Sequence, residues 1–422
     1  MRQSELFTRA RREAPTDEVA KNAKLLIRAG FIHKEMAGVY SYLPLGLRVI
    51  RKLENLIRRA MLALPAQEVL LPALQSKESW LATGRWDKMT DLYKLRDESG
   101  REFALGPTHE EVVTPLVKNF LSSYQDLPCL PAGRPFAIFQ FQTKFRMEPR
   151  VKSGLLRTRE FLMKDLYSFH RDAAGLKLFY DEVINGYRAI FKTLGLESST
   201  YLTLAGGGTF AEFSHEFQTL TAAGEDRILI CAACHLAVNE EIKDKRPTCP
   251  GCAGELSPPQ TSIETANIFD LGTNFSRAFN LTYRDENGAR QPVLMACYGF
   301  GVSRLLGALA EIMADDRGLV WPPPVAPFTI HLLPLGPAAG RPAAAARELY
   351  EQLQKLGLET LWDDRPVSAG EKFAEADLIG IPYRVVISDR TLAVSPKVEL
   401  TERQNSGEKR LVTVNELCAF LG

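Results

Sequence analysis

The stretch of sequence that decides the fold is residues 144–161, KFRMEPRVKSGLLRTREF, taken together with residues 298–304, YGFGVSR. The first stretch joins two β-rich runs, 136–145 and 159–169, through a polar segment that contains a glycine, which predicts a β-hairpin. In the second stretch, a glycine turn leads from a strand into the helical run VSRLLGALAEIMA. Paired strands beside an isolated helix favour an antiparallel sheet over regular β-α-β alternation.

The hairpin concentrates charge on one face. Side chains two residues apart on a strand share a face, so we expect Arg146 to lie beside Glu148. On the returning strand, Arg157, Arg159 and Phe161 share that face. Guanidinium groups and an aromatic ring together suit phosphates and a planar base, which indicates a site for ATP. The alternative is a surface hairpin with ordinary salt bridges.

Arg304 extends this interpretation from a distant part of the chain. It follows the two glycines of GFGVSR at the expected start of a helix, where the helix dipole favours anions. A dinucleotide-binding loop is excluded, because its fingerprint needs a third glycine where Arg304 stands and an acidic residue about 20 positions later. A glycine turn before an ordinary core helix is the remaining alternative.

The rest of the chain is rich in strands with helices between them, which predicts an α+β fold with a mainly antiparallel sheet. The expected elements are helices at 16–32 (with Thr16 as its cap), 46–64 and 176–194, and strands at 68–74, 102–106, 264–271, 279–284 and 292–298. After the proline-rich linker at 321–328, strand and helix alternate, which indicates a separate small α/β domain.

Composition excludes several classes of protein. The chain has 422 residues and a net charge of +1, so it is long enough for two or three domains but has no global basic field. No apolar run is long enough to span a bilayer, and MRQSELFTRARREAPTDEV lacks the apolar core of a secretory signal. These features predict a cytoplasmic protein without a membrane partner.

Four of the seven cysteines form two CxxC pairs, Cys231 with Cys234 and Cys249 with Cys252, separated by fourteen residues. This spacing is typical of a zinc ribbon, and four thiolates would close the coordination sphere, so we expect structural Zn²⁺. The alternative is a set of thiols that stays empty or becomes oxidised.

The motifs together resemble a known family. RMEPR and LLRTREF resemble the second signature motif of class II aminoacyl-tRNA synthetases, GFGVSR resembles their third, and the helix and strand at 46–72 resemble the first. Closer similarity to bacterial-type prolyl-tRNA synthetases lies in GPTHEE (106–111), QTKFR (142–146), REFLMKDLYSFH (159–170), SHEFQ (214–218), ACYGFG (296–301) and DDRPVSAGEKFAEADLIGIP (363–382). The resemblance covers nearly the whole chain apart from residues 222–262.

This resemblance implies ATP-dependent activation of L-proline and its transfer to the 3′ end of tRNA(Pro), with Mg²⁺ beside the phosphates. Arg146 at the α-phosphate and Arg304 at the γ-phosphate would be the catalytic cations. The implied ATP-binding residues are Arg146, Glu148, Arg157, Phe161, Gln218 and Arg304. The implied proline-binding residues are Thr108, Glu110, Arg146, His170, Ser214, His215 and Cys297. His170 and Cys297 could instead be packed core residues.

The resemblance also implies a domain layout. The catalytic core would occupy 1–221 and 263–326, the cysteine ribbon 222–262, and an anticodon-binding domain 327–422. The residues implied to lie near the anticodon are Asp364, Arg365, Lys372 and Phe373, although a charged surface loop is an alternative for each. The first motif usually builds a dimer interface, so a homodimer is expected.

Many bacterial members of the family carry a large editing insertion where this chain has only the short ribbon, so we expect no editing of alanyl-tRNA in cis. Three other interpretations of the chain are open. They are another class II synthetase (threonyl, glycyl or histidyl), a non-catalytic tRNA-binding paralogue, and a zinc-ribbon nucleic-acid binder, which would explain only the insertion.

Overall fold

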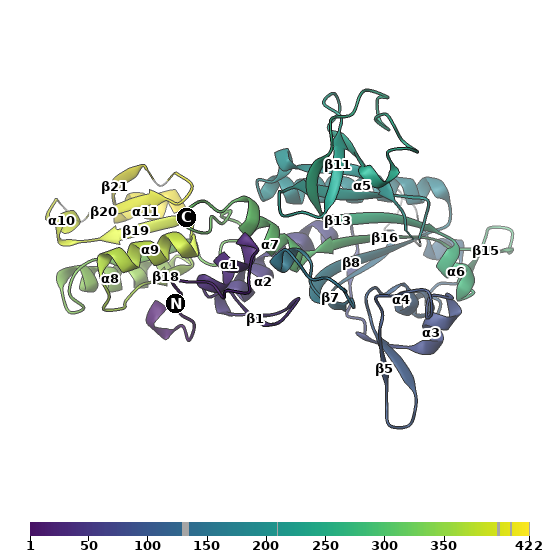
Figure 1. Ribbon diagram of the computed structural model, residues 1–422, viewed down its shortest axis with the longest axis horizontal. Coiled ribbons are helices and arrows are strands. Elements are labelled where there is room, and N and C mark those ends of the chain that lie inside the picture. The colour runs from purple at the N-terminus through teal and green to yellow at the C-terminus, as the bar shows by residue number, and fades with distance from the viewer. Residues whose placement is uncertain (129–134, 209, 395–396, 406, 422) are drawn as a thin grey trace. The chain divides into compact units, whose positions relative to one another are not determined.

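The structure is a computed structural model that describes residues 1–128, 135–208, 210–394, 397–405 and 407–421 (Figure 1). Contacts divide the chain into two compact units. Unit 1 comprises Met1–Glu35, Tyr40–Lys52 and Leu309–Gly422, and unit 2 comprises Met36–Val39 and Leu53–Ala308. Cys129, one of the cysteines in the sequence, lies outside the described residues.

A nine-stranded sheet forms the centre of unit 2, in the order β10-β9-β12-β11-β13-β16-β8-β7-β3. Its strands are β3 (Gln67–Glu68), β7 (Phe136–Phe145), β8 (Glu160–His170), β9 (Thr200–Gly206), β10 (Phe213–Leu220), β11 (Asp226–Ile230), β12 (Leu236–Asn239), β13 (Gln260–Gly272) and β16 (Leu294–Gly301). Neighbouring strands are antiparallel except in the pairs β3–β7 and β9–β12. The predicted mainly antiparallel α+β sheet is therefore confirmed, and the predicted hairpin is the pair β7–β8.

The cysteine ribbon is built into this sheet. Strand β10 pairs with β13 as well as with β9, so the five strands β9, β10, β13, β11 and β12 close into a ring. Two members of the ring, β11 and β12, come from the ribbon, residues 222–262. The long strand β13 can join the ring and the central sheet at once because its first residues pair with β11 and its last with β16.

Helix α5 (Ala173–Thr193) contacts β8 and β16 and covers one face of the sheet. Asp172 caps its start by accepting from the Gly175 backbone N–H at 2.8 Å. Rings from the helix and the sheet then pack edge to face, as in Tyr187 against Phe300, with 5.0 Å between centroids. Because α5 buries this face, the opposite face of the same strands is the one available for a ligand.

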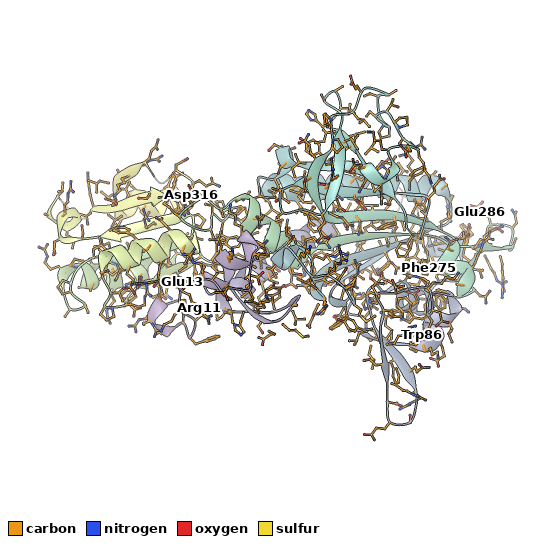
Figure 2. All side chains as sticks on the ribbon, in the orientation of Figure 1. Arg11, Glu13, Trp86, Phe275, Glu286 and Asp316 are labelled. Atoms are coloured by element: carbon orange, nitrogen blue, oxygen red, sulfur yellow. The ribbon has the colours of Figure 1, made fainter. Side chains whose placement is uncertain are left out.

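Smaller elements surround the open face. They are β4 (Leu74–Ser76), α3 (Lys77–Ala82), β5 (Tyr93–Arg96), β6 (Glu102–Leu105), α4 (Glu110–Val117), α6 (Asn274–Ala278), β14 (Thr282–Arg284) and β15 (Arg290–Pro292). Strands β4, β6 and β5 form a three-stranded sheet supported by a small apolar cluster that includes Trp80 and Trp86 (Figure 2). The predicted strand at 68–74 is not continuous: Glu68 ends β3, irregular chain follows around Pro72, which cannot donate to a ladder, and Leu74 begins β4.

Unit 1 contains a five-stranded sheet in the order β18-β17-β19-β20-β21. Its elements are β17 (Ile330–Pro334), α8 (Arg341–Lys355), β18 (Thr360–Trp362), α9 (Ala369–Ile379), β19 (Tyr383–Ile387), α10 (Asp389–Ala393), β20 (Lys397–Glu402), β21 (Lys409–Thr413) and α11 (Val414–Leu421). Strands β18, β17 and β19 are parallel, which agrees with the predicted α/β alternation, and β20 and β21 add an antiparallel edge.

The N-terminal part of unit 1 differs from the sequence prediction. Helix α1 (Lys21–Arg28) is shorter than the expected 16–32, and Thr16 does not cap it, since Ala20 precedes the first turn without a side-chain cap. The hairpin strands β1 (Ile32–Met36) and β2 (Val39–Tyr42) were not predicted. Helices α2 (Pro44–Ala63) and α7 (Val302–Ile312), which run from one unit into the other, agree closely with the expected helices.

Among the described residues, none of the helices combines the length and the apolar character needed to cross a bilayer.

Candidate active site

Two adjoining cavities lie on the sheet face opposite α5. The first has a volume of about 340 Å³ and is lined by the 107–110 loop, by residues of β8, β13 and β16, and by Gly206–Gly207–Gly208, the glycine loop. The second, smaller cavity is lined by residues of the 146–161 hairpin together with Arg304. Four residues line both cavities: Arg146, Met163, Glu264 and Asn267. A ligand with two chemically different halves could therefore occupy both cavities and meet Arg146 at their junction.

Two acids lie at the start of α4, of which Glu110 lines the first cavity and Glu111 is buried behind it. The Thr108 hydroxyl donates to the carboxylate of Glu110, which is almost fully buried. Glu111 accepts two hydrogen bonds from Arg85 Nη1, at 2.9 and 3.1 Å, and burial raises its pKa to about 7. Burial and the nearby Glu110 also raise the pKa of the Cys297 thiol well above its usual value, so the thiol stays protonated. This side of the cavity offers a hydroxyl and a carboxylate as acceptors.

Arg85 is a site residue that sequence reasoning missed. Its guanidinium lies over the rings of Trp80 and Phe210, with 5.2 and 4.8 Å to the centroids, and near Phe275 at 5.6 Å. It comes from a segment without a recognisable motif, and its carboxylate partner Glu111 lies 26 residues away in the sequence. The need for a cation here follows from the burial of Glu111, which only the structure shows.

Beneath the first cavity, Lys144 and Asp165 form a buried ion pair, with 2.8 Å between Lys144 Nζ and Asp165 Oδ1. Gln140 donates to the other carboxylate oxygen at 2.9 Å. Burial and the Lys144 charge lower the pKa of His109 to about 4, so its ring is neutral. Its Nε2 lies 3.1 Å from the Pro72 carbonyl oxygen and must donate there, which leaves Nδ1 to accept from Lys144. This network holds the loop that carries Thr108 and Glu110, and the sequence reasoning had not included it.

Arg146 and Glu148 lie beyond the end of β7, which corrects the prediction that they alternate along a strand. The chain leaves the ladder at Phe145, and Arg146 retains a single backbone bond to the Arg159 carbonyl, at 2.9 Å. The Arg146 guanidinium lies over the Phe161 ring, with 5.2 Å to the centroid. Its Nε is buried and has no hydrogen-bond partner within the described part of the chain. A buried N–H donor without a protein partner can donate a hydrogen bond to an acceptor atom of a ligand.

Glu148, Arg157 and Arg304 are each paired with protein groups in the second cavity region. Arg157 donates to Glu148 Oε2 at 2.7 and 2.9 Å and also pairs with Glu225. Arg304, in the first turn of α7, donates to the backbone oxygen of Glu264 at 2.6 Å and lies 3.3 Å from its carboxylate. A cation that is held by carboxylates in this way can exchange those partners for phosphate oxygens.

Gly299 lies where the two cavities meet and has a steric reason to be glycine. A Cβ atom there would lie 2.3 Å from Met163 Cε and 2.4 Å from Asn267 Oδ1. Asn267 Oδ1 accepts from the Gly299 N–H at 3.1 Å, which ties β13 to β16 at this point. The glycine pattern of YGFGVSR therefore serves close packing of the cavity wall as well as the turn into α7.

Four predicted site residues occupy other positions. His170 bonds to Ser168 at 2.8 Å and packs against Phe179 of α5, and His215 bonds to Tyr180 of α5 at 2.7 Å. Both histidines thus lie on the α5 face and are not neighbours of the first cavity, because strand alternation sends them away from it. Ser214 donates to the Gly206 carbonyl at 3.1 Å, and Gln218 is buried between Glu216, Asp226 and Ser262. These two residues support the walls of the site.

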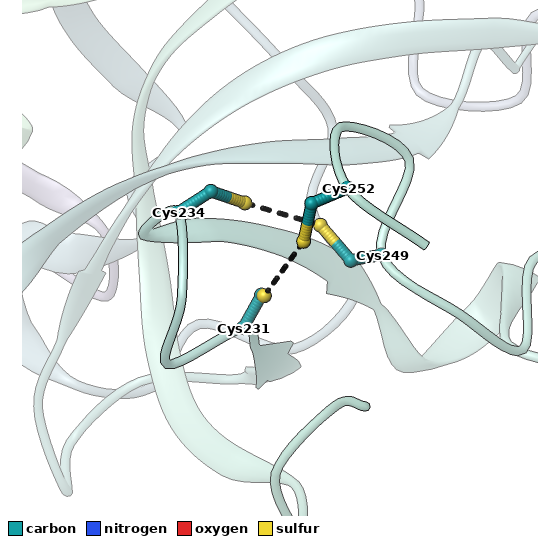
Figure 3. Close-up of side chains that lie close together, drawn as sticks. All are labelled: Cys231, Cys234, Cys249 and Cys252. Carbon is teal, nitrogen blue, oxygen red and sulfur yellow. Dashed lines mark hydrogen bonds between the residues drawn. The ribbon is translucent and has the colours of Figure 1, made fainter. Parts of the chain in front are cut away.

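The four cysteines of the two CxxC pairs converge in space (Figure 3). Their sulfur atoms all lie within 4.8 Å of one another, with 3.5 Å between Cys231 and Cys252 and 3.2 Å between Cys234 and Cys249. A tetrahedral Zn²⁺ with Zn–S bonds of about 2.3 Å requires sulfur separations of about 3.8 Å. A Cβ atom at Gly254 would lie 3.2 Å from the Cys252 sulfur, so glycine leaves room for the sulfur cluster. The residues fit a four-thiolate zinc site.

In unit 1, the residues implied to lie near the anticodon are engaged with the protein. Asp364 accepts from Ser4 Oγ at 2.7 Å, Arg365 is paired with Asp363 at 2.8 Å, and Lys372 donates to two backbone carbonyls. These three residues line a cavity of about 340 Å³ between the end of β17 and the start of α8. Phe373 packs beneath the Arg384 guanidinium, with 5.1 Å to the ring centroid.

Comparisons with known proteins define the class of the chain. Residues 93–313 match the family model described as "tRNA synthetase class II core domain (G, H, P, S and T)", and residues 329–422 match the model described as "Anticodon binding domain". Two solved prolyl-tRNA synthetases share the fold. The enzyme of Cryptosporidium parvum, complexed with L-proline and AMP, aligns with a TM-score of 0.75 at 19% identity, covering 94% of this chain and 73% of the other. The enzyme of Giardia lamblia, in complex with prolyl-adenylate, aligns with a TM-score of 0.75 at 20% identity, covering 93% and 74%.

Sequence comparison is more specific. The chain is 33% identical to the proline–tRNA ligase of Bacillus subtilis over 574 residues, covering all of both chains, and 32% identical to that of Desulfitobacterium hafniense over 572 residues, covering 99% and 97%. It therefore belongs to the proline–tRNA ligase family of class II aminoacyl-tRNA synthetases. Both alignments are much longer than the 422 residues of this chain, so these relatives carry additional segments.

Proposed function

We propose that the protein activates L-proline with ATP to form prolyl-adenylate and transfers the prolyl group to the 3′ end of tRNA(Pro). The observation that carries this proposal is the pair of cavities that share Arg146. The first cavity presents the Thr108 hydroxyl and the Glu110 carboxylate, which suit the two N–H donors of a secondary ammonium. The second is lined by Arg146 and Arg304, which suit phosphates, and Arg157 is paired with Glu148 of the same cavity. Membership of the proline–tRNA ligase family supports the use of proline and ATP in one reaction.

The proposed chemistry needs no nucleophilic side chain. The proline carboxylate attacks the α-phosphorus of ATP, the bond to pyrophosphate breaks, and Arg146 stabilises the charge that builds on the α-phosphate. A terminal ribose hydroxyl of tRNA then attacks the adenylate carbonyl, and AMP leaves. The protein contributes by holding the carboxylate and phosphorus in line, which converts a bimolecular step into a unimolecular one.

The remaining ATP contacts follow from the second cavity. Phe161 lies beside Arg146 and would stack on adenine, and Glu148 would accept from its amino group when Arg157 turns to the γ-phosphate. Arg304 would bind the same γ-phosphate from α7. Mg²⁺ would neutralise the phosphates, and Glu264, which lines both cavities, is the carboxylate suited to hold it.

In the first cavity, Cys297 would form part of the apolar wall against the proline ring, since its thiol stays protonated. We retain Thr108, Glu110, Arg146 and Cys297 as proline-binding residues. His170, Ser214 and His215 would act only through packing.

Two further parts of the proposal concern partners. The cysteine ribbon binds one structural Zn²⁺, because four converging thiolates with no open position leave no place for a substrate. The cavity of unit 1 that is lined by Asp364, Arg365 and Lys372 receives the anticodon bases of tRNA(Pro).

The protein is proposed to form a homodimer through the region around the end of α2. Leu62, Leu70 and Leu74, which lie within thirteen residues of the sequence, are 53%, 76% and 52% exposed, and exposed large apolar side chains are typical of an interface. The absence of editing in cis and a cytoplasmic location remain predictions from the sequence.

The experiment that tests the function is ATP–pyrophosphate exchange with proline, run beside alanine, threonine, glycine, histidine and cysteine, with Mg²⁺ present. We expect strong exchange with proline and weak exchange with alanine, because a pocket rejects a smaller analogue by only about 10–200-fold. Exchange with another amino acid alone would establish a different class II specificity. Folded protein that exchanges with none of them would establish a non-catalytic paralogue.

A further inference from the structure

The cysteine ribbon is joined to the active site at three separate points. Its first contact is made by Glu241, just after β12, whose Oε1 accepts from the Gly206 backbone N–H at 2.6 Å. Gly206 begins the glycine loop that lines the first cavity. A Cβ atom at Gly206 would lie 2.8 Å from this same carboxylate oxygen, so glycine permits the close approach. The wall of the amino-acid cavity is thus fastened directly to the ribbon.

The second and third contacts reach the rest of the site. Asp226, the first residue of β11, accepts from Gln218 Nε2 at 3.0 Å, and Gln218 in turn donates to Glu216, which lines the first cavity. Glu225 pairs with Arg157, which is proposed to bind the γ-phosphate. These contacts reach the lining of the first cavity at Gly206, and they reach Arg157, which is paired with Glu148 of the second cavity.

The backbone connects the cysteines to these contacts. Cys231 and Cys234 form the turn between β11 and β12, where the Cys231 N–H donates to the Leu236 carbonyl at 2.8 Å. Strand β12 then pairs in parallel with β9, with Val238 opposite Leu204, two residues before Gly206. Asn239 ends β12 and accepts from the Glu241 N–H at 3.2 Å, which sets the position of Glu241. A cluster that ties the cysteine turns together therefore fixes the strand that places Glu241.

We infer that the cysteine ribbon is a structural part of the amino-acid site, and that Glu241 is a positioning residue for the glycine loop. The inference rests on the proposed function, and it predicts a selective effect on the amino acid. Loss of Glu241 frees the loop at Gly206 and weakens proline binding, while the contacts of Arg146 and Arg304 with ATP are unchanged. Loss of the metal also weakens proline binding, because it releases the turn that holds β12.

The primary test compares Glu241→Ala, Glu241→Gln and the control Glu240→Ala. Glu240 is the neighbouring residue and forms only a surface pair with Arg227, at 3.1 Å. We expect Glu241→Ala to raise KM for proline roughly tenfold in pyrophosphate exchange, with KM for ATP and kcat within about twofold, since a hydrogen bond to a charged group is lost. Glu241→Gln retains an acceptor oxygen and stays near wild type, as does Glu240→Ala.

Two readouts that do not depend on activity complete the test. Hydrogen exchange of the peptide that contains Gly206 is expected to accelerate in Glu241→Ala and to stay unchanged in Glu240→Ala. A Cys249→Ser variant is expected to lose its zinc, measured as metal per chain, and to show the same faster exchange at Gly206. Unchanged proline KM and unchanged Gly206 exchange in Glu241→Ala would overturn the inference, as would an equal rise in KM for proline and ATP. Wild-type protein without proline exchange would refute the proposed function, while the exchange at Gly206 would still decide the role of Glu241.

Discussion

The Lys144–Asp165 pair allows a quantitative prediction. Both side chains are at least nine-tenths buried, and Lys144 Nζ lies 2.8 Å from Asp165 Oδ1. Lys144→Met keeps an unbranched side chain, one heavy atom shorter, but leaves the Asp165 carboxylate buried without its cation. Removing one partner of a buried pair costs about 3–5 kcal/mol, because an uncompensated charge remains. The double variant Lys144→Met/Asp165→Asn removes both charges and is expected to recover most of this loss.

The loss of stability in Lys144→Met also depends on pH. The pKa of Asp165 in the folded protein determines whether this loss grows or shrinks as pH rises. In the wild type, burial alone would raise the pKa of Asp165, but the Lys144 charge and the neighbouring donors lower it overall. The pair therefore stabilises the fold above the unfolded pKa of Asp, about 4, and this contribution is lost as pH falls through the lower folded pKa. In Lys144→Met the largest opposing charge is gone, and burial is expected to outweigh the remaining donors such as Gln140, so the folded pKa of Asp165 rises. The variant is then most stable at acid pH and weakens as pH increases through that raised pKa.

The assay is native-state hydrogen exchange of the peptides that cover β7 and β8, which reports the free energy of opening in this part of the sheet. The control is Lys177→Met, which removes the exposed pair with Asp181 and is expected to change stability by less than about 0.5 kcal/mol. A loss below about 1 kcal/mol in Lys144→Met would refute the reasoning. So would a double variant that is no more stable than the single one.

Three further predictions concern the site and the ribbon. Arg146→Ala is expected to lower the rate of proline-dependent pyrophosphate exchange by about 10²-fold or more, since a transition-state donor is lost, while Arg150→Ala, an exposed neighbour, retains activity. Near-normal exchange by Arg146→Ala would exclude its role at the α-phosphate. Freshly purified, reduced protein is expected to contain about one zinc per chain by metal analysis, and protein free of metal would contradict the four-thiolate site. Purified protein is expected not to hydrolyse alanyl-tRNA, and release of alanine above the buffer rate would show editing in cis.

Much of the fold was predictable because its signals are local. The runs at 136–145 and 159–169 show strand-forming residues around a polar glycine segment, and they became β7 and β8. The α/β alternation of the C-terminal sheet followed from a change of pattern after the proline-rich linker, although contacts group this sheet with Met1–Glu35 and Tyr40–Lys52 in unit 1. Where the prediction was wrong, as for Arg146 and Glu148, the strand ends at Phe145, before both residues, because backbone pairing ends with the partner strand and not with the local sequence.

The candidate site was predictable only in part. Thr108, Glu110, Arg146 and Arg304 belong to recognisable motifs and line the two cavities. Arg85 belongs to no motif, and its carboxylate partner Glu111 lies 26 residues away in the sequence. For His170 and His215 the resemblance implied a place beside the pocket, and the structure has both side chains on the side of their strands that faces α5.

The amino-acid sequence by itself determined the α+β class, the arginines of the hairpin, the two cysteine pairs and the family resemblance. These depend on residue type, spacing and short-range periodicity, all of which can be read along the chain. Only the tertiary structure decided that the ribbon closes a ring with β9, β10 and β13, and that Glu241 reaches Gly206. Such contacts join segments far apart in the sequence, and their partners are selected by burial, by the twist and register of the sheet, and by the packing of α5. These contact partners depend on the fold of the whole chain, so they cannot be predicted from a local sequence pattern.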